Sequence, residues 1–241
     1  MTLVITVANT AGGVGKTTTT HALAVAFAEY GNRTLLIDLD VRGSATYLLG
    51  VENPRITAID VLRGSAPLSS AITTTSERFY LLPSDSRLSH LDEKESDLAQ
   101  MAKRLRRELE LQDSPFDFVI IDSPSTISKT LLLSLNLADF AIAPTTLTMT
   151  SVRGVLQVLE LAKTTNWLGA LPILTHSASN QLLELLADEI EILSPHIPKS
   201  NLVSDAALAG KSVLNNAKSG SVALAYRELA YFLLERINSK S

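Results

Sequence analysis

The feature that most constrains the fold is a glycine-rich segment at residues 8–18, with the sequence ANTAGGVGKTT. It follows a short apolar run at residues 3–7 and precedes an alanine-rich stretch with helical character. A strand, a glycine loop and a helix start in this order form a cradle for phosphate groups, because loop N–H groups and the helix dipole both point at the anion. The alternative is an ordinary glycine-rich turn that happens to carry a lysine.

Two side chains of this loop have the chemistry that a nucleotide site needs. Lys16 is expected to reach the β- and γ-phosphates, and the Thr17 hydroxyl is expected to ligate Mg²⁺. The strict pattern G-x-x-x-x-G-K-[ST] needs glycine at position 10, where this chain has Thr10. The loop residues predicted to contact the nucleotide are Ala11, Gly12, Gly13, Val14, Gly15, Lys16, Thr17 and Thr18. Pro198, Lys199 and His176 are candidates for the base pocket, with an ordinary loop position as the alternative for His176.

Aspartates follow two further apolar runs that read as buried strands, residues 34–38 and 118–122. Ligands bind at the carboxyl ends of strands in parallel α/β sheets, so these carboxylates are expected to converge on the glycine loop. We predict that Asp122 holds Mg²⁺ through water and that Asp38 also belongs to the metal site. Asp40 is predicted to hold the attacking water near the γ-phosphate. A helix N-cap is the alternative role for a carboxylate at the end of a strand.

These segments resemble the ParA/MinD family of positioning ATPases. Residues 12–18 look like its deviant Walker A motif, and residues 36–46 are similar to its A′ segment, usually written D-x-D-P-Q-G-N-A-T. Residues 120–125 match its Walker B segment, 138–144 its following strand, and 225–230 the start of its last helix. The resemblance covers almost the whole chain. It implies an α/β P-loop NTPase fold, with a mostly parallel twisted sheet covered by helices on both faces, that hydrolyses ATP with Mg²⁺.

One departure from the family pattern concerns charge. The family's signature lysine normally stands directly before Gly12 and reaches the phosphates of a partner subunit, but this chain has Ala11 there. The McdA-like carboxysome-distribution branch is similar in lacking that lysine, and it uses a basic residue from the second half of the chain. Arg153 is the first candidate for this role, because a cation at a helix start has no dipole reason to be there. Lys129 is the second, and a solvated surface side chain is the alternative for both.

The resemblance also implies partners. It predicts a homodimer closed over ATP, nonspecific binding to nucleoid DNA, and a ParB-like or McdB-like adaptor protein that stimulates a weak ATPase to position a plasmid, chromosome or carboxysome. The net charge of −4 requires the basic residues to cluster on one face if DNA is to bind. The candidates in the C-terminal third are Lys199, Lys211, Lys218, Arg227, Arg236 and Lys240. A small-molecule kinase and a catalytically silent nucleotide-binding module on the same scaffold are the alternatives.

Composition limits the remaining classes. With 241 residues, of which 46% are hydrophobic, the chain is expected to form one ParA-like P-loop ATPase domain over residues 1–241. The absence of cysteine excludes disulfides, thiolate zinc sites and iron–sulfur clusters. We expect a cytoplasmic, nucleoid-associated protein without a signal peptide or membrane segment. Leu233, Leu234 and Ile237 fall at helical spacing, so the last helix is expected to pack on the sheet rather than on a membrane.

Apolar runs and helical patterns alternate along the chain, which predicts a parallel sheet with helices on both faces. Further strands are expected at residues 79–83, 140–144 and 171–175. Helices are expected at residues 21–30, 58–63, 91–112, 155–163, 181–193 and 221–237.

Overall fold

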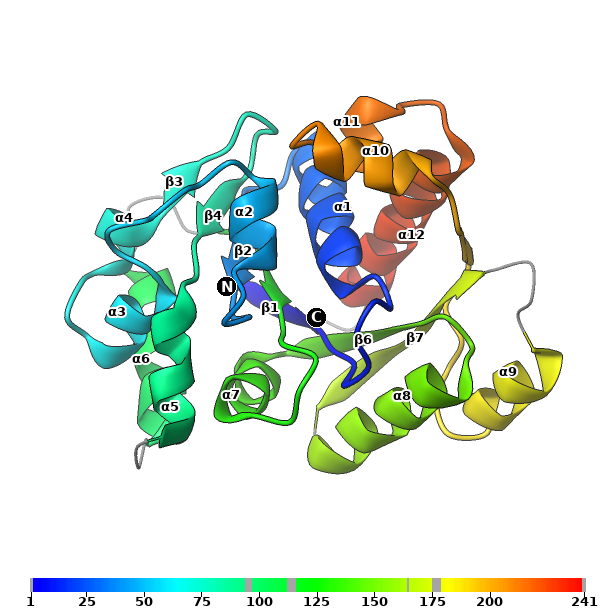
Figure 1. Ribbon diagram of the computed structural model, residues 1–241, viewed down its shortest axis with the longest axis horizontal. Helices are drawn as coiled ribbons and strands as arrows, with labels where there is room; N and C mark the ends of the chain where they lie inside the picture. Colours follow the sequence, from blue (N-terminus) through cyan, green and yellow to red (C-terminus); the bar gives the residue numbers. More distant parts are fainter. Residues whose placement is uncertain (1, 94–96, 112–115, 164, 175–178, 240–241) are drawn as a thin grey trace.

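A twisted sheet of eight strands organises the chain. The computed structural model describes residues 2–93, 97–111, 116–163, 165–174 and 179–239. The strands are β1 (Leu3–Val7), β2 (Thr34–Asp38), β3 (Thr73–Thr74), β4 (Tyr80–Leu82), β5 (Phe118–Asp122), β6 (Phe140–Thr145), β7 (Asn166–Leu174) and β8 (Ile197–Pro198). Their order in the sheet is β3-β4-β2-β5-β1-β6-β7-β8 (Figure 1). All neighbours are parallel except β3, which runs antiparallel to β4 at one edge.

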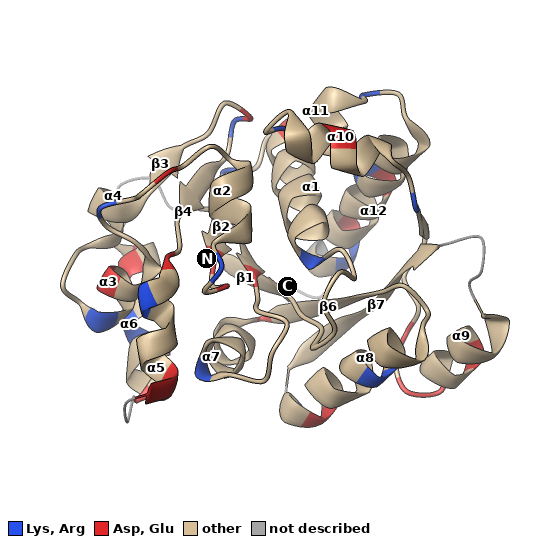
Figure 2. Cartoon of the chain, in the orientation of Figure 1, with Lys and Arg blue, Asp and Glu red and all other residues tan. Residues whose placement is uncertain are grey.

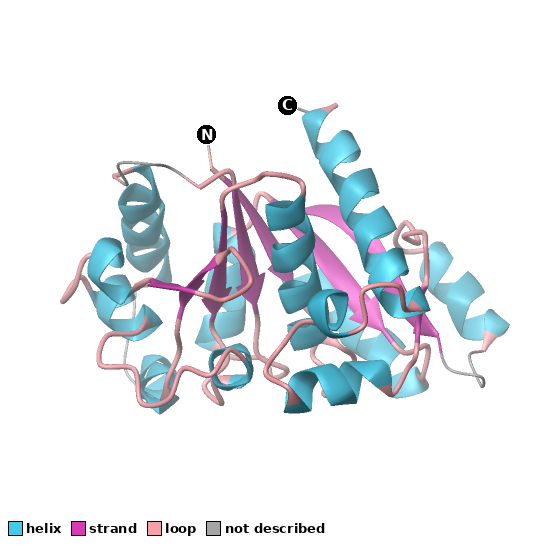
Figure 3. Cartoon of the chain, turned by 90° about the horizontal axis from the view of Figure 1, so that it is seen from above, coloured by secondary structure: helices cyan, strands magenta, loops and turns pink. Residues whose placement is uncertain are grey.

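Helices connect the strands and cover both faces of the sheet, as Figure 3 shows. They are α1 (Lys16–Glu29), α2 (Ser44–Leu48), α3 (Ala58–Arg63), α4 (Leu68–Ala71), α5 (His90–Glu93), α6 (Leu98–Glu110), α7 (Lys129–Leu137), α8 (Met149–Leu161), α9 (Asn180–Ala187), α10 (Leu202–Leu208), α11 (Val213–Asn216) and α12 (Ser221–Asn238). The predicted α/β fold class, a mostly parallel sheet with helices on both faces, is confirmed. In the described part of the chain, no helix is both long enough and apolar enough to span a bilayer.

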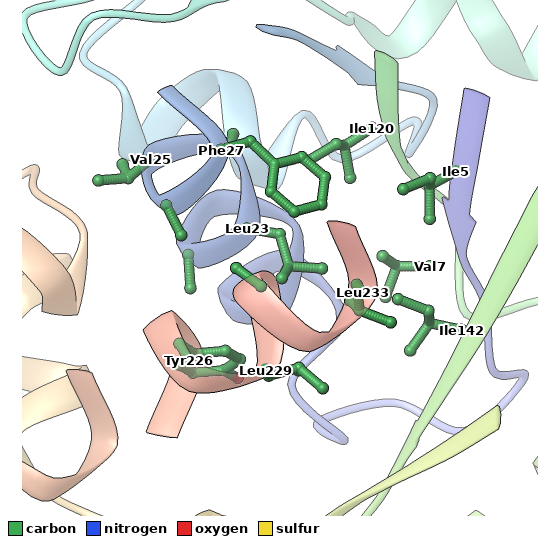
Figure 4. Close-up of a cluster of buried hydrophobic side chains, with 14 of the residues drawn as sticks. Ile5, Val7, Leu23, Val25, Phe27, Ile120, Ile142, Tyr226, Leu229 and Leu233 are labelled. Atoms are coloured by element: carbon green, nitrogen blue, oxygen red, sulfur yellow. The ribbon is translucent and has the colours of Figure 1, made fainter. Parts of the chain in front are cut away.

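The core divides into two layers because successive side chains of a strand point to opposite faces. Ile5 and Val7 of β1 belong to the layer under α1 and α12, whereas Val4 belongs to the layer under α3, α6 and α7. Leu233 of α12 is fully buried in the first layer together with Ile142 of β6, and Figure 4 shows the two close to Val7. The predicted packing of the last helix on the sheet is therefore confirmed.

Four helix predictions fail at their ends for identifiable reasons. The helix expected over residues 155–163 starts six residues earlier, at Met149, because the Thr148 side chain accepts from Ser151 N and caps it. The helix expected over residues 91–112 is two helices, because the Asp97 side chain accepts from Gln100 N at 2.9 Å and caps the start of α6. The helix expected over residues 181–193 ends at Ala187, because residues 191–193 leave the helix and bond to Ala170 at the edge of β7. The first helix starts at Lys16 rather than His21, directly after the left-handed Gly15.

A buried polar cluster joins the first helix to the C-terminal part of the fold. Glu77, in the turn between β3 and β4, contacts His21 Nε2 of α1, and both side chains are less than one tenth exposed. Glu77 Oε1 also accepts from Ser212 N at 2.9 Å and from Asn215 Nδ2 at 2.6 Å. Burial alone would raise the pKa of Glu77, but these hydrogen bonds and His21 outweigh it and lower the pKa below its ordinary value.

Candidate functional site

The glycine loop between β1 and α1 has a shape that specific glycines permit. Gly13 and Gly15 have φ angles of 70° and 86°, in the left-handed region that side chains disfavour. A Cβ atom on Gly15 would also lie 2.5 Å from Cδ1 of Ile173 in β7. The end of the loop is thus packed directly against the neighbouring strand. Left-handed glycines directly before a helix are typical of loops whose N–H groups bind phosphate.

Asn9 anchors the first part of the loop to the β6–α8 connection. Its Nδ2 donates to Pro144 O at 2.8 Å and to Ser151 O at 3.1 Å, while its Oδ1 accepts from Ala11 N at 2.8 Å. A Cβ atom on Gly154 of α8 would lie 2.1 Å from Asn9 Oδ1. Helix α8 therefore lies directly on the loop. Sequence reasoning missed Asn9, although a polar side chain directly after a buried strand was the available signal.

A pocket of about 330 Å³ opens at the loop and joins it to the ends of β2 and β5. The residues that line it are Gly12, Gly13, Gly15, Lys16, Thr17, Thr18, Asp40, Arg42, Ser44 and Ser125. Lys16 Nζ donates to Ala11 O across the loop at 2.9 Å. Burial lowers the pKa of Lys16 to about 8, although Asp122 and Asp40 act in the opposite direction. The predicted convergence of the loop with the strand-end aspartates holds for Asp40, which lines the pocket.

Asp38 and Asp122 are paired neighbours on β2 and β5, but their carboxylates have different surroundings. Asp38 Oδ2 accepts from the N–H and the hydroxyl of Thr46 at 2.9 and 2.8 Å, and Oδ1 accepts from Asp40 N at 3.0 Å. Neither oxygen of the fully buried Asp122 has a hydrogen-bond partner with good geometry among the described residues. Burial and the charge of Asp38 raise the pKa of Asp122, and Thr17 and Lys16 lower it only in part.

This contrast bears on which carboxylate suits a metal. A buried carboxylate without donors is costly, and a cation is the group that relieves the cost. Among the described residues no group of three His, Cys, Asp or Glu side chains is arranged to hold a metal ion. Mg²⁺ does not need such a cage, because it binds through one or two carboxylates, substrate phosphates and waters. Asp122 with the Thr17 hydroxyl fits that ion, whereas the oxygens of Asp38 are already occupied in holding the A′ segment.

Asp40 lies at the pocket with its carboxylate engaged by Arg42. Arg42 donates from its backbone N–H to Asp40 Oδ1 at 3.0 Å and from Nη2 to Oδ2 at 3.1 Å. The Arg42 Nη2 atom also donates to the Ser125 hydroxyl at 2.9 Å, in the loop after β5. Sequence reasoning singled out Asp40 but missed Arg42. Its position two residues after Asp40, in the A′ segment, was the available signal.

Arg153, Pro198 and His176 are predicted site residues that do not belong to the glycine loop. Arg153 is exposed on α8, directly before Gly154, whose Cα packs on Asn9 and Ala11. Pro198 pairs with Leu174 in the sheet, one residue beyond the Ile173 side chain that touches Gly15. Both therefore lie near the loop. His176 lies outside the described residues.

Lys129 begins α7, where its backbone N–H donates to Asp92 Oδ1 at 2.7 Å. The C-terminal basic residues do not form one free cluster. Arg227 is paired with Glu29 at 2.7 Å, and Arg236 is paired with Glu191 at 2.5 Å. Figure 2 shows Lys and Arg distributed over several elements, with acidic residues between them.

Comparisons with known proteins agree with this geometry. The AAA_31 family, described as an AAA domain, matches residues 2–168. The chain is 32% identical to the chromosome-partitioning ATPase Soj of Thermus thermophilus, over 97% of this chain and 96% of that protein. It is 30% identical to the maintenance of carboxysome distribution protein A of Synechococcus elongatus, over 66% of this chain and 64% of that protein.

A solved structure is similar over the full length. The structure is cobyrinic acid a,c-diamide synthase from Mycobacterium smegmatis with bound ADP and magnesium. Its TM-score is 0.83 at 33% identity, and the alignment covers 100% of this chain and 97% of that one. The family match spans more than half of the chain, and the similarity to Soj spans nearly all of it. The predicted resemblance is confirmed, and the chain belongs to the AAA_31 family as a ParA-like deviant Walker ATPase.

Proposed function

We propose that this chain is a ParA-like switch that binds ATP with Mg²⁺ and hydrolyses it in order to position or segregate a large cargo. The pocket supports this proposal because it gathers the phosphate loop, Lys16 and Asp40 in one cavity. The relatives support it as well, because one is a chromosome-partitioning ATPase and another maintains carboxysome distribution. Similarity to a structure that contains ADP and magnesium supports the choice of ligand.

Each residue of the proposed site has a separate role in hydrolysis. Loop N–H groups and Lys16 bind the phosphates and stabilise the charge that develops on the transferred group. The Thr17 hydroxyl and the Asp122 carboxylate would hold Mg²⁺, which would neutralise charge on the phosphate oxygens. Asp40 orients the attacking water and accepts its proton. Asp38 is retained in the proposed site as the residue that fixes the A′ segment through Thr46, rather than as a direct metal ligand.

The single observation that carries the proposal is the buried Asp122 carboxylate. Among the described residues it has no hydrogen-bond donor in good geometry, and it is pushed towards the neutral form by burial and by Asp38. Folding would not favour such a group unless a cation used it. Thr17 and Lys16 both act on the pKa of Asp122, so this carboxylate lies close to the two loop residues beside which a metal would bind.

Partner binding is the finer part of the proposal. Two copies close over their nucleotides, and the dimer binds nucleoid DNA without sequence preference until a ParB-like or McdB-like adaptor stimulates hydrolysis. Ala11 leaves the loop without the signature lysine, which favours the McdA-like branch, and Arg153 is placed on the surface beside the loop to act across the dimer. The pairing of Arg227 and Arg236 leaves Lys199, Lys211 and Lys218 as the described C-terminal candidates for DNA phosphates. Lys240, the remaining candidate, lies outside the described residues.

Hydrolysis is tested with Asp40→Ala. The variant should bind ATP and lose turnover by about a hundredfold or more, since a positioned base contributes about 10²–10⁴ in rate. ATP binding is followed by calorimetry and turnover by phosphate release. Equal turnover in the variant and the wild type would remove Asp40 from this role.

Dimerisation and DNA binding are tested on the same preparations. Arg153→Ala should weaken ATP-dependent dimer formation in light scattering, and an unchanged dimer would count against that assignment. DNA binding should require ATP and weaken steeply with salt, because it depends on phosphate contacts. DNA binding that is equal without nucleotide would contradict the switch.

A small-molecule reaction is the second candidate, and the similarity to a synthase favours it over the silent module. In that case ADP release would need a small acid or other metabolite and would not respond to DNA or to an adaptor protein. The silent module predicts no ATP turnover at all. Phosphate release measured with DNA, with adaptor protein and with candidate acids separates the three.

A further inference from the structure

Arg42 occupies an unusual place for a charged surface residue. Its guanidinium lines the nucleotide pocket together with Lys16, and among the charged residues that line this pocket these two are the cations. The remaining charged residue of the lining, Asp40, is bonded to Arg42. The A′ pattern quoted above has glutamine at the position of Arg42, and it has a lysine in the loop where this chain has Ala11. Compared with the family pattern, this chain therefore lacks the cation at the position of Ala11 and has an additional cation, Arg42, at another edge of the pocket.

The contacts of Arg42 span the mouth of the pocket. Nε and Nη2 reach Asp40 Oδ1 and Oδ2 at 3.3 and 3.1 Å, and Nη2 also reaches the Ser125 hydroxyl at 2.9 Å. The guanidinium therefore bridges the A′ segment and the loop after β5, both of which line the pocket beside Lys16. Its planar fork matches a phosphate as well as it matches a carboxylate.

The fold does not depend on this bridge. The Arg42 side chain is 64% exposed, and exposed ion pairs contribute little to stability because water and salt screen them. Exchange of the carboxylate for a phosphate therefore costs the guanidinium little, and Asp40 keeps the backbone N–H of Arg42 as a donor at 3.0 Å. The Asp40 side chain is only 7% exposed, so the loss of its partner leaves a buried carboxylate ready to bind water.

We propose that Arg42 is the cation that replaces the missing loop lysine, from within the same subunit. Without nucleotide it holds Asp40; when a triphosphate binds, the guanidinium moves to the γ-phosphate oxygens and releases the Asp40 carboxylate to hold the attacking water. This inference rests on the proposed function, because it requires ATP in the pocket. It differs from the assignment of Arg153, which acts from α8 across a dimer.

The first test compares ATP with ADP, because only ATP has the γ-phosphate. Binding is measured by calorimetry on protein dilute enough to remain monomeric, as checked by sedimentation. Arg42→Gln should weaken ATP binding by about tenfold to a hundredfold, the usual range for a charged hydrogen bond, and leave ADP binding unchanged. Arg42→Lys should lose less. Arg55→Gln is the matched control, because Arg55 is exposed on the segment that follows α2 and does not line this pocket.

The second test measures coupling between Arg42 and Asp40. Asp40→Asn frees the guanidinium, so it should strengthen ATP binding in the wild-type background and have no such effect when Arg42 is glutamine. Thermal unfolding without nucleotide identifies temperatures at which Arg42→Gln and the wild type are both folded, and an unchanged ADP affinity measured there separates a binding defect from a folding defect.

Four outcomes would overturn the inference. The first is that Arg42→Gln loses ATP and ADP affinity equally, and the second is that Arg153→Ala, and not Arg42→Gln, loses ATP affinity selectively in monomers. The third is that Arg42→Gln loses ATP affinity only where dimers form. The fourth is that the effects of Asp40→Asn and Arg42→Gln on ATP affinity are additive. Faster hydrolysis by Arg42→Gln with unchanged ATP affinity would make Arg42 a restraint on Asp40 and nothing more. None of these outcomes contradicts the proposed function. A wild-type protein that binds neither ATP nor ADP would contradict the proposed function itself.

Discussion

Gly154 gives the sharpest test of how the phosphate loop is supported. In an exposed helix, alanine in place of glycine stabilises by about 1 kcal/mol. At this position the added methyl group would lie 2.1 Å from Asn9 Oδ1 and 2.9 Å from Ala11 N. Asn9 cannot stay where it is, so Gly154→Ala should act against the intrinsic preference of the helix.

The expected magnitude follows from the bonds of Asn9. Its displacement breaks two hydrogen bonds from Nδ2 and one to Oδ1, all buried. At about 1 kcal/mol each, their loss outweighs the helix gain and leaves a net destabilisation of about 2 kcal/mol. For a domain of this size that is a fall of about 4–8 °C in Tm. Because Asn9 holds the N–H of Ala11, we also expect ATP affinity to fall about tenfold or more.

The assay is thermal unfolding without nucleotide together with calorimetric ATP binding. Gln157→Ala is the control, because it removes the 2.6 Å contact between Gln157 and the Thr10 hydroxyl without adding bulk at the loop. It should change both quantities less than Gly154→Ala does. If Gly154→Ala were more stable than the wild type and bound ATP normally, the close packing of α8 on the loop would be refuted.

Two further predictions concern buried carboxylates. Burial raises the pKa of Asp122 to about 8, so its carboxyl is an unpaired buried charge only above that pH. Asp122→Asn should therefore raise Tm of the nucleotide-free protein by about 2–4 °C at about pH 9, and it should abolish the Mg²⁺-dependent part of ATP binding. A lower Tm at that pH, or Mg²⁺-dependent binding that persists, would contradict it. Glu77→Gln should reduce stability at pH 7 by about 1–3 kcal/mol through its bonds to His21, Ser212 and Asn215. The pKa of Glu77 is lowered from 4.5, so its stabilisation is present above that pH and is lost as the pH falls through the folded value. Urea unfolding should therefore show the gap between variant and wild type closing below about pH 4.5, and a gap that does not change with pH would argue against the assignment.

The sequence predicted the helix at residues 58–63 with its observed bounds, because local chemistry sets both ends. Thr57 and Asp60 form a capping box at its start, and Gly64 ends it in the left-handed conformation. The helix expected over residues 91–112 failed because helical composition continues through Asp97, whose side chain caps a new helix instead of extending the old one. Helix ends that depend on a few neighbouring residues could be predicted from the sequence. The role of Asp97 could not, because an aspartate can either continue one helix or cap the start of the next.

The site shows the same division. The loop and Asp40 were predictable because their spacing along the chain is itself the signal. The different surroundings of Asp38 and Asp122 were not predictable, because both end a buried strand. They differ through Thr46, eight residues further along, whose N–H and hydroxyl reach one carboxylate and not the other. The position of Arg42 in the A′ segment could have been read from the sequence, but its contact with Ser125, 83 residues away, exists only in the folded chain.

The central place of β1 has a consequence for how the chain is made. This strand is synthesised well before its neighbours in the sheet, β5 and β6, which begin at Phe118 and Phe140. The layer over it is completed by α12, which ends at Asn238. A nascent chain therefore exposes the apolar strand β1 without a neighbouring strand until β5 has emerged, and this core layer closes only after α12 has been made. Stalled or truncated products of this gene should be prone to aggregation and dependent on chaperones.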